Sequence, residues 1–182
     1  DIASEANVSK PTLYVYFTSK EQLFADICAE RRDRNISELI DMLDRSRPID
    51  EVLMRLGTEA LRRLIQLDIF PAHRIVIGVA ERMPQIGREL HRSGAQRLTD
   101  ELDNYLAHHV ATGALVIPDT QLAAAQFLEL SQATVFRRNI YAAGDGRVPD
   151  AEIVRIVDSA VAMFMAGYAS RGAAGQSAAN RS

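Results

Sequence analysis

The sequence predicts an all-α fold, with a short pair of helices at the N-terminus followed by a larger helical bundle. Most stretches place apolar residues at helical spacing, and strand-like alternation is scarce. Prolines divide these stretches, at Pro11, Pro48, Pro71, Pro84, Pro118 and Pro149. Because proline is tolerated in the first turn of a helix and costly further in, we expect helix starts or kinks at these points.

The composition narrows the class of protein. The chain has 182 residues, of which 47% are hydrophobic and 25% charged, as in an ordinary globular protein. Its single cysteine, Cys28, permits no internal disulfide, so we expect a reducing compartment, the cytoplasm. The longest apolar run, 160–167, is far shorter than the roughly 20 residues that span a bilayer. A net charge of −3 argues against binding nucleic acid over the whole surface but allows a small local element.

The individual helices follow from apolar periodicity and end signals. Ser19 and Gln22 form a capping-box pattern that opens a helix, which extends to Arg45 if it is uninterrupted. Further helices are expected at 50–67, 74–83, 85–112, 119–143 and 150–169. The run 74–83 is strand-like, but we favour a helix because no second strand is present to pair with it. Gly94 is a candidate break, and residues 171–182 are predicted to be a disordered tail.

The first 24 residues predict a helix-turn-helix. A short amphipathic helix is followed by a turn at Asn7–Ser9 and a second short helix at Lys10–Phe17. Asparagine tolerates a sharp turn, and serine is a good N-cap. Leu13 and Phe17 lie four residues apart, so they share one face and are expected to pack inward.

The rest of the second helix is left to point outward. Tyrosine hydroxyls, lysine ammonium groups and helix N-termini donate hydrogen bonds to phosphate oxygens, whereas proline and threonine can contact base edges and thymine methyls. The candidate DNA-binding residues are Lys10, Pro11, Thr12, Tyr14, Tyr16 and Lys20, with Val15 also outward. The alternative interpretation is a solvated helical hairpin whose aromatic side chains merely pack the domain.

Three N-terminal segments resemble the DNA-binding signature of TetR/AcrR-type bacterial transcriptional regulators. They are Asp1–Ala3, Ala6–Phe17 and Ser19–Phe24. The resemblance implies a helical homodimer, in which an N-terminal helix-turn-helix reads a palindromic operator and a C-terminal domain binds a small effector. It also implies that Lys10–Tyr16 is the recognition helix, with Lys10, Pro11 and Thr12 near the bases and Tyr14, Tyr16 and Lys20 on the DNA backbone.

Two features depart from that family pattern. Asn7 replaces the usual glycine of the turn, which is a small physical change. The family's first helix and basic arm do not precede Asp1, so the helix-turn-helix is incomplete and we expect an N-terminal piece to be missing. Residues 1–47 hold seven Lys and Arg against nine acidic residues, a net charge of −2. We therefore expect this segment by itself to bind DNA poorly.

The last two helices predict a dimer interface. Each is apolar on more than one face, which in a chain of this size favours a surface shared with a second subunit over a deeply buried helix. The candidate interface residues are Leu122, Leu130, Val154, Val157, Val161 and Met165. In the resembled family the same helices pair into a four-helix bundle, which would space two recognition helices about 34 Å apart, one turn of B-DNA.

The middle helices hold enough apolar and aromatic residues to line a ligand pocket. The candidate lining residues are Leu61, Phe70, His73, Ile77, Tyr105, Phe127 and Phe136. For each residue taken singly, ordinary core packing is the more common alternative. Arginines outnumber acidic residues between positions 73 and 98, which allows an anionic ligand, although a solvated basic face is the preferred interpretation.

No catalytic or metal site is predicted. The four histidines lack metal-ligand spacing to a carboxylate or to Cys28, and neither a nucleophile motif nor a glycine-rich phosphate loop is present. We expect no enzymatic activity and no cofactor.

The prediction is therefore a DNA-binding regulator, taken to be a ligand-responsive repressor. Its expected parts are a DNA-binding domain with a connecting helix at 1–46, an effector-binding and dimerisation domain at 47–170, and the tail at 171–182. Its expected partners are a double-stranded DNA operator, a second copy of the chain and a small-molecule effector, without a membrane. The alternative is a helical small-molecule-binding or scaffold protein whose helix-turn-helix is vestigial.

Overall fold

The computed structural model describes residues 35–66, 69–141 and 147–170, together with the single residues Ser9, Val15 and Leu23. Most of these residues are helical, and the others lie in turns and loops with one isolated bridge between Leu115 and Ala169, so the all-α prediction is confirmed. The helices are α4 (Ile49–Gln66), α5 (Ile69–Val79), α6 (Pro84–His91), the π-helical η1 (Arg92–Gln96), α7 (Arg97–Ala111), α8 (Thr120–Ser131), α9 (Val135–Ile140) and α10 (Asp150–Tyr168). Residues 35–40, which precede α4, are also helical.

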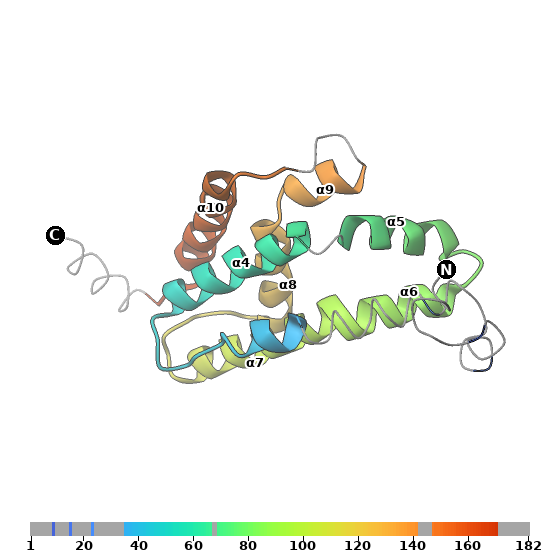
Figure 1. Cartoon of the computed structure of the whole chain (residues 1–182). Coiled ribbons are helices and arrows are strands. Elements are labelled where there is room, and N and C mark those ends of the chain that lie inside the picture. The colour runs from blue at the N-terminus through green and yellow to red at the C-terminus, as the bar shows by residue number, and fades with distance from the viewer. Residues whose placement is uncertain are drawn as a thin grey trace.

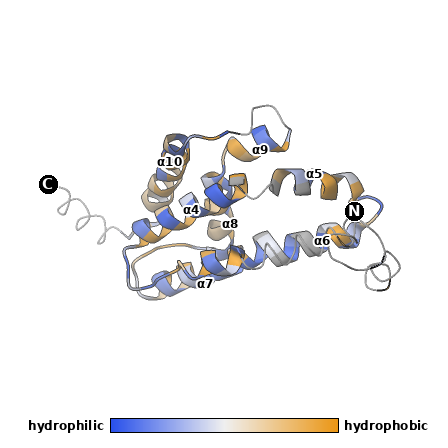
Figure 2. Cartoon of the chain, viewed as in Figure 1, coloured by the Kyte–Doolittle hydropathy of each residue, from blue (hydrophilic) through white to orange (hydrophobic). Residues whose placement is uncertain are grey.

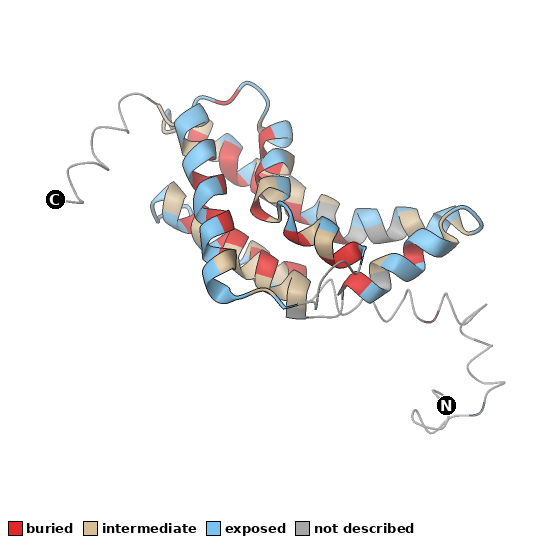
Figure 3. Ribbon diagram, turned by 90° about the horizontal axis from the view of Figure 1, so that it is seen from above, coloured by how far each residue is buried: buried red, intermediate tan, exposed pale blue. Residues whose placement is uncertain are grey.

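The hydrophobic core lies among α4, α7, α8 and α10, while α5 and α6 extend side by side away from it (Figure 1). Buried residues line the inward faces of these helices, and their outward faces are largely exposed (Figure 3). The apolar and polar residues of each helix separate in the same way, as helical periodicity predicts (Figure 2). Core side chains with no exposed area include Val52, Leu53, Leu56, Leu102, Leu106, Phe127, Val135 and Val157.

Helices α4, α8 and α10 come close together at Gly57. An ideal Cβ atom at this position would lie 2.7 Å from Cγ1 of Val157 and 3.1 Å from Oγ of Ser131. Real Cβ atoms do not approach a neighbour as closely as 2.7 Å, so only glycine fits between the helices without a shift.

The helix predicted at 119–143 is divided into two. Asp119 begins it as expected, because its carboxylate accepts a hydrogen bond from the backbone N–H of Leu122 at 2.9 Å. The helix then stops at Ser131, and α9 begins at Val135 after a three-residue turn. Within that turn Thr134 has a φ of 70°, a conformation that no α-helix contains. The prediction of a single long helix at 119–143 was therefore wrong.

The segment predicted at 85–112 is continuous, and Gly94 does not break it. The chain passes from α6 through η1 into α7 along one rod (Figure 1). Gly94 is buried in the π-helical turn, where one helical turn is widened. The segment predicted at 74–83 is also helical, although α5 begins earlier, at Ile69.

The helix that leads toward α4 does not reach Arg45. Its last described helical residue is Ile40, and tighter turns follow, with Met42 N–H bonded to Leu39 C=O at 3.1 Å. Asp44 then holds a turn, because its carboxylate accepts bonds from both the hydroxyl and the backbone N–H of Ser46. These two bonds, the hydroxyl first, lower the pKa of Asp44.

Among the described residues, none of the helices is both long enough and apolar enough to cross a membrane.

Candidate functional site

The predicted DNA-binding residues lie outside the residues that the structure describes. They are Lys10, Pro11, Thr12, Tyr14, Tyr16 and Lys20. Three described residues lie near them: Ser9, which is exposed, Val15, which is helical and exposed as predicted, and Leu23, which is buried. The predicted inward residues Leu13 and Phe17, the turn at Asn7–Ser9 apart from the exposed Ser9, and the tail at 171–182 also lie outside this description.

The structure does not bring the predicted pocket residues together into one group. Leu61, Tyr105 and Phe127 belong to the main core, where each is almost fully buried. Phe70, His73 and Phe136 form a separate cluster described below. The side chain of Ile77 is 62% exposed on α5, so it cannot line an enclosed pocket within this chain.

The separate aromatic cluster lies between α5 and α9. The ring centroids of Phe70 and Phe136 are 5.9 Å apart, and the His73 ring meets Phe136 edge-on at 5.8 Å. Nη1 of Arg74 donates a hydrogen bond of 3.0 Å to the backbone C=O of Asn139, near the end of α9. An arginine at a helix C-terminus also interacts favourably with the helix dipole, so this contact holds α9 against α5. The cluster offers two half-buried aromatic rings beside one buried ring.

Two side chains with polar groups, Tyr105 and His109, lie next to each other in the main core on α7. The rings of Tyr105 and His109 are 4.6 Å apart, and both side chains are buried. The Tyr105 hydroxyl and Nε2 of His109 have no hydrogen-bond partner among the described residues. Burial, assisted by the carboxylates of Asp44 and Asp50, raises the pKa of Tyr105 to about 12. Burial, then the neighbouring His108 and Arg45, lowers the pKa of His109.

The predicted dimer residues fall into two sets. Leu122 on α8 is 54% exposed and Val154 on α10 is 42% exposed, while Leu130 and Met165 are half-buried. Val157 and Val161 are buried within the chain. Val157 fills the space beside Gly57, so its side chain is not available to a partner. The inward stripe of α10 thus serves the chain's own core.

The outward face of α10 combines apolar and small side chains. Ala162 and Ala166 are exposed there, and Met163 is exposed on the same helix. Small side chains allow two helices to approach closely, which suits this face to packing against another helix.

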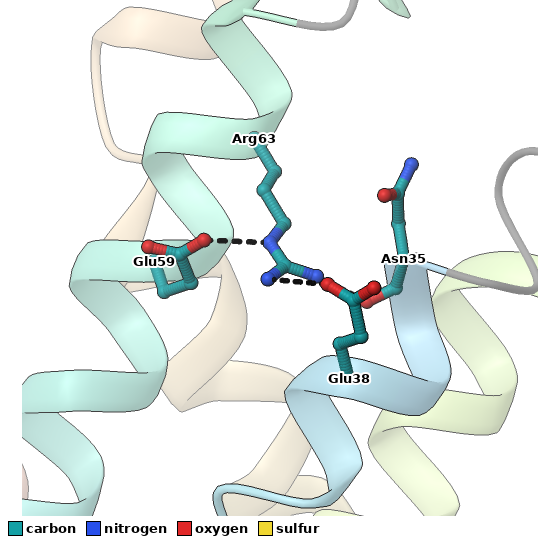
Figure 4. A network of polar contacts seen from close by, with 4 residues as sticks. All are labelled: Asn35, Glu38, Glu59 and Arg63. Atoms are coloured by element: carbon teal, nitrogen blue, oxygen red, sulfur yellow. Dashed lines mark hydrogen bonds and ion pairs between the residues drawn. The ribbon is translucent and has the colours of Figure 1, made fainter.

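An arginine that the sequence interpretation missed connects α4 to the segment 35–40 (Figure 4). Arg63 contacts Glu59 on its own helix and both Glu38 and the backbone of Asn35 on the preceding segment. The spacing of Glu59 and Arg63, four residues apart, is a recognisable helical ion-pair signal. Nothing in the sequence, however, indicated that the same guanidinium reaches residues 25 and 28 positions earlier.

The described residues contain no group of three or more histidine, cysteine, aspartate or glutamate side chains placed to hold a metal ion.

Comparison with known families gave two matches in chain order. Residues 1–27 match the sequence profile of the bacterial regulatory proteins of the tetR family. Residues 51–170 match the profile of the C-terminal domain of AefR-like transcriptional repressors. A search among curated proteins found no significant match.

Solved structures with the same fold extend this comparison. One, from Mesorhizobium loti, is assigned to the TetR-family transcriptional regulators; it is 26% identical, with a TM-score of 0.83 over 93% of this chain and 85% of that chain. The flavonoid-responsive regulator FrrA is 26% identical, with a TM-score of 0.73 and the same coverage. A TetR-family regulator from Pseudomonas syringae pv. tomato is 26% identical, with a TM-score of 0.68 over 92% of this chain and 83% of that chain.

Proposed function

Because this chain belongs to the TetR family of bacterial regulatory proteins, we propose that it acts as a dimeric, ligand-responsive repressor of a palindromic operator. The chain is a transcriptional regulator with an AefR-like repressor C-terminal domain, and regulators of this family are DNA-binding proteins rather than enzymes. The proposal adds the operator, the dimer, the effector and a cytoplasmic location. It also keeps the division into a DNA-binding part at 1–46 and an effector-binding and dimerisation part at 47–170.

The observation that carries the dimer proposal is the outward face of α8 and α10. Leu122, Val154 and Met163 are large apolar side chains that remain exposed on these two helices. Pairing these helices with those of a second copy would remove this apolar surface from water. It would also hold two DNA-reading segments in a two-fold arrangement, which matches the symmetry of a palindromic site.

The dimer is tested by sedimentation of the full chain and a Val154→Glu variant. We expect the parent to sediment as a dimer at micromolar concentration and the variant as a monomer, because a buried unpaired carboxylate opposes association. Ile75→Glu is the matched control: it places the same carboxylate at a similarly exposed apolar residue, 44% exposed on α5 and outside the proposed dimer face, and we expect this variant to remain a dimer. A monomeric parent would refute the proposed dimer.

Operator binding is tested by selecting duplexes from a random DNA pool with the dimeric protein. The selected duplexes should contain inverted repeats, with half-sites about one helical turn apart or a little more. Binding that is independent of sequence, or half-sites without inverted symmetry, would contradict the proposed mode of recognition.

For the effector we propose an aromatic small molecule that packs between α5 and α9. The support is the cluster of Phe70, His73 and Phe136, together with the flavonoid response of the similar regulator FrrA. Binding there would alter the packing of α5 on α9 and so favour one conformation of the effector domain over another.

Quercetin, a flavonoid, serves as the probe, and its absorbance is followed as it is titrated with the protein. We expect saturable binding that Phe136→Ala weakens about tenfold, the loss that accompanies removal of one well-packed ring contact. Tyr141→Ala, which removes an exposed aromatic ring just beyond α9, should leave the affinity unchanged. Equal affinities in all three proteins would exclude the cluster as the binding place.

A further inference from the structure

We propose that Arg63 is a positioning residue for operator binding. Its guanidinium holds the helical segment 35–40 at a fixed orientation against α4. It thereby sets the direction in which the preceding DNA-reading residues leave the effector domain. The inference rests on the proposed function, since it assigns Arg63 a part in presenting those residues to DNA.

All three nitrogens of the guanidinium are engaged (Figure 4). Nε donates to Oε1 of Glu59 at 2.7 Å, within α4. Nη1 donates to the backbone oxygen of Asn35 at 2.8 Å, and Nη2 lies 2.9 Å from Oε2 of Glu38. Two of the three acceptors therefore belong to the segment 35–40, and the third fixes the arginine to its own helix.

The burial of Arg63 distinguishes its contacts with the segment 35–40 from an ordinary surface ion pair. The side chain of Arg63 is only 15% exposed, whereas that of Glu38 is 56% exposed. The Glu38 contact alone would be weakened by water and salt. The bond to the Asn35 carbonyl is partly buried and charge-assisted, and Glu59 orients the guanidinium plane for it. The rigid planar fork of arginine is what satisfies three acceptors at once, which a lysine ammonium cannot do in this geometry.

The segment 35–40 is also anchored by apolar contacts, and Arg63 adds a constraint on its rotation that these contacts do not supply. Ile36 and Leu39 are three residues apart on one face, and both are buried in the core. A helix held by one apolar face can still roll about that face. Arg63 on α4 and Arg97 on α7, whose Nη2 lies 3.2 Å from Oγ of Ser37, hold its polar side from two neighbouring helices. They oppose such a roll.

The segment 35–40 lies between the DNA-binding part of the chain and α4, so the contact with Arg63 bears on DNA binding. Residues 1–27 match the family's DNA-binding profile, and α4 begins at Ile49, so the segment 35–40 lies on the covalent path between the two. In this proposal, a change in the orientation of the segment also changes the placement of the DNA-reading residues before it. Two recognition helices must fit successive turns of the major groove together, so a loss of orientation raises the entropic cost of binding.

The test compares the full chain with Arg63→Lys and Arg62→Lys. Arg62→Lys is the matched control, because Arg62 is the adjacent residue of α4 and pairs with Asp150 on α10 instead of the segment 35–40. Hydrogen exchange of the amides at 35–40 is measured first. We expect about fivefold faster exchange in Arg63→Lys, unchanged exchange in α10, and parent rates at 35–40 in Arg62→Lys.

The affinity for a selected operator duplex is measured second. We expect Arg63→Lys to bind about fivefold more weakly and Arg62→Lys to bind like the parent. Glu38→Gln should give only part of the loss, because it weakens one of the three contacts of the Arg63 guanidinium.

The outcomes separate this inference from the proposed function. Parent rates of exchange at 35–40 in Arg63→Lys would show that the arginine does not hold the segment. Faster exchange with undiminished operator affinity would overturn the positioning role, even though the parent binds its operator. A parent protein that selects no duplex at all would instead refute operator binding itself, and the positioning role with it.

Discussion

Gly57 and Val157 lie so close together that a Cβ atom on the glycine would be 2.7 Å from Cγ1 of the valine. Val157 is β-branched and fully buried, so its side chain has little freedom to move away. The contact joins α4, which follows the segment held by Arg63, to α10, which bears the proposed dimer face. This contact therefore links the helix that carries Arg63 to the helix that carries the proposed dimer face, and the proposed function depends on both.

We predict that Gly57→Ala destabilises the protein by about 1–2 kcal/mol, since overpacking outweighs the better helix propensity of alanine. Adding Val157→Ala should recover part of this loss, because it removes the atom that clashes. Gly78→Ala is the control, since nothing lies within 4 Å of a Cβ added there. Denaturant unfolding measures the free energies, and a stabilised Gly57→Ala variant would contradict the close packing.

The second prediction concerns acid stability. Burial lowers the pKa of His109 in the folded protein, with smaller effects from His108 and Arg45, so the folded state favours the neutral ring. The unfolded chain binds the proton more readily. His109 therefore contributes its full stability above the ordinary histidine pKa of about 6.5, and that contribution is lost as the pH falls below it.

Replacement of His109 by glutamine should flatten the decline in unfolding free energy between about pH 7 and pH 5. His91→Gln, which changes an exposed residue at the end of α6, should keep the parent's decline. Two parallel curves for the parent and His109→Gln would show that this ring does not contribute to acid sensitivity.

A third prediction follows from the turn between α8 and α9. Thr134 has a φ of 70°, which is costly for a β-branched residue and accessible to glycine. We expect Thr134→Gly to raise the free energy of unfolding by about 0.5–1 kcal/mol. Thr112→Gly should lower it, because Thr112 has a φ of −85° and its hydroxyl donates to the His109 carbonyl.

The fourth prediction separates two kinds of DNA contact in the recognition helix. Replacing Tyr16 or Lys20 with alanine should weaken binding to all duplexes about equally and, for Lys20, reduce the salt dependence, because these residues are predicted to contact phosphates. Replacing Lys10 or Thr12 should change the order of preference among selected duplexes. Binding assays on matched operator and scrambled duplexes distinguish these outcomes, and unchanged affinity in all four variants would exclude this helix as the DNA-reading element.

Several helix limits were predictable because local signals specify them. The carboxylate of Asp119 caps α8, and Pro149 precedes the regular apolar pattern of α10. The limits that the sequence interpretation misplaced depend on neighbours distant in sequence. Apolar periodicity continues through Thr134, yet the chain turns there and α9 packs against α5, which lies far from it in sequence.

The candidate surfaces, like the helix limits, were predictable only in part from the sequence. The apolar residues of α10 were recognisable as a group, but the sequence does not say which of two apolar stripes faces the chain's own core. Val157 proved to be buried against Gly57, while Val154 stayed exposed. Likewise, Phe127 and Phe136 are both aromatic residues of the segment predicted as one helix, yet they belong to different clusters because α8 ends between them.

The sequence by itself determined the helical class and the regulator family, because periodicity and short motifs are properties of neighbouring residues. Tertiary structure decided which helix faces are shared, where the long helix is interrupted, and that Arg63 spans from α4 to Asn35 and Glu38. Those features depend on the distance between segments remote along the chain. That distance is fixed only when the core closes around residues such as Val157.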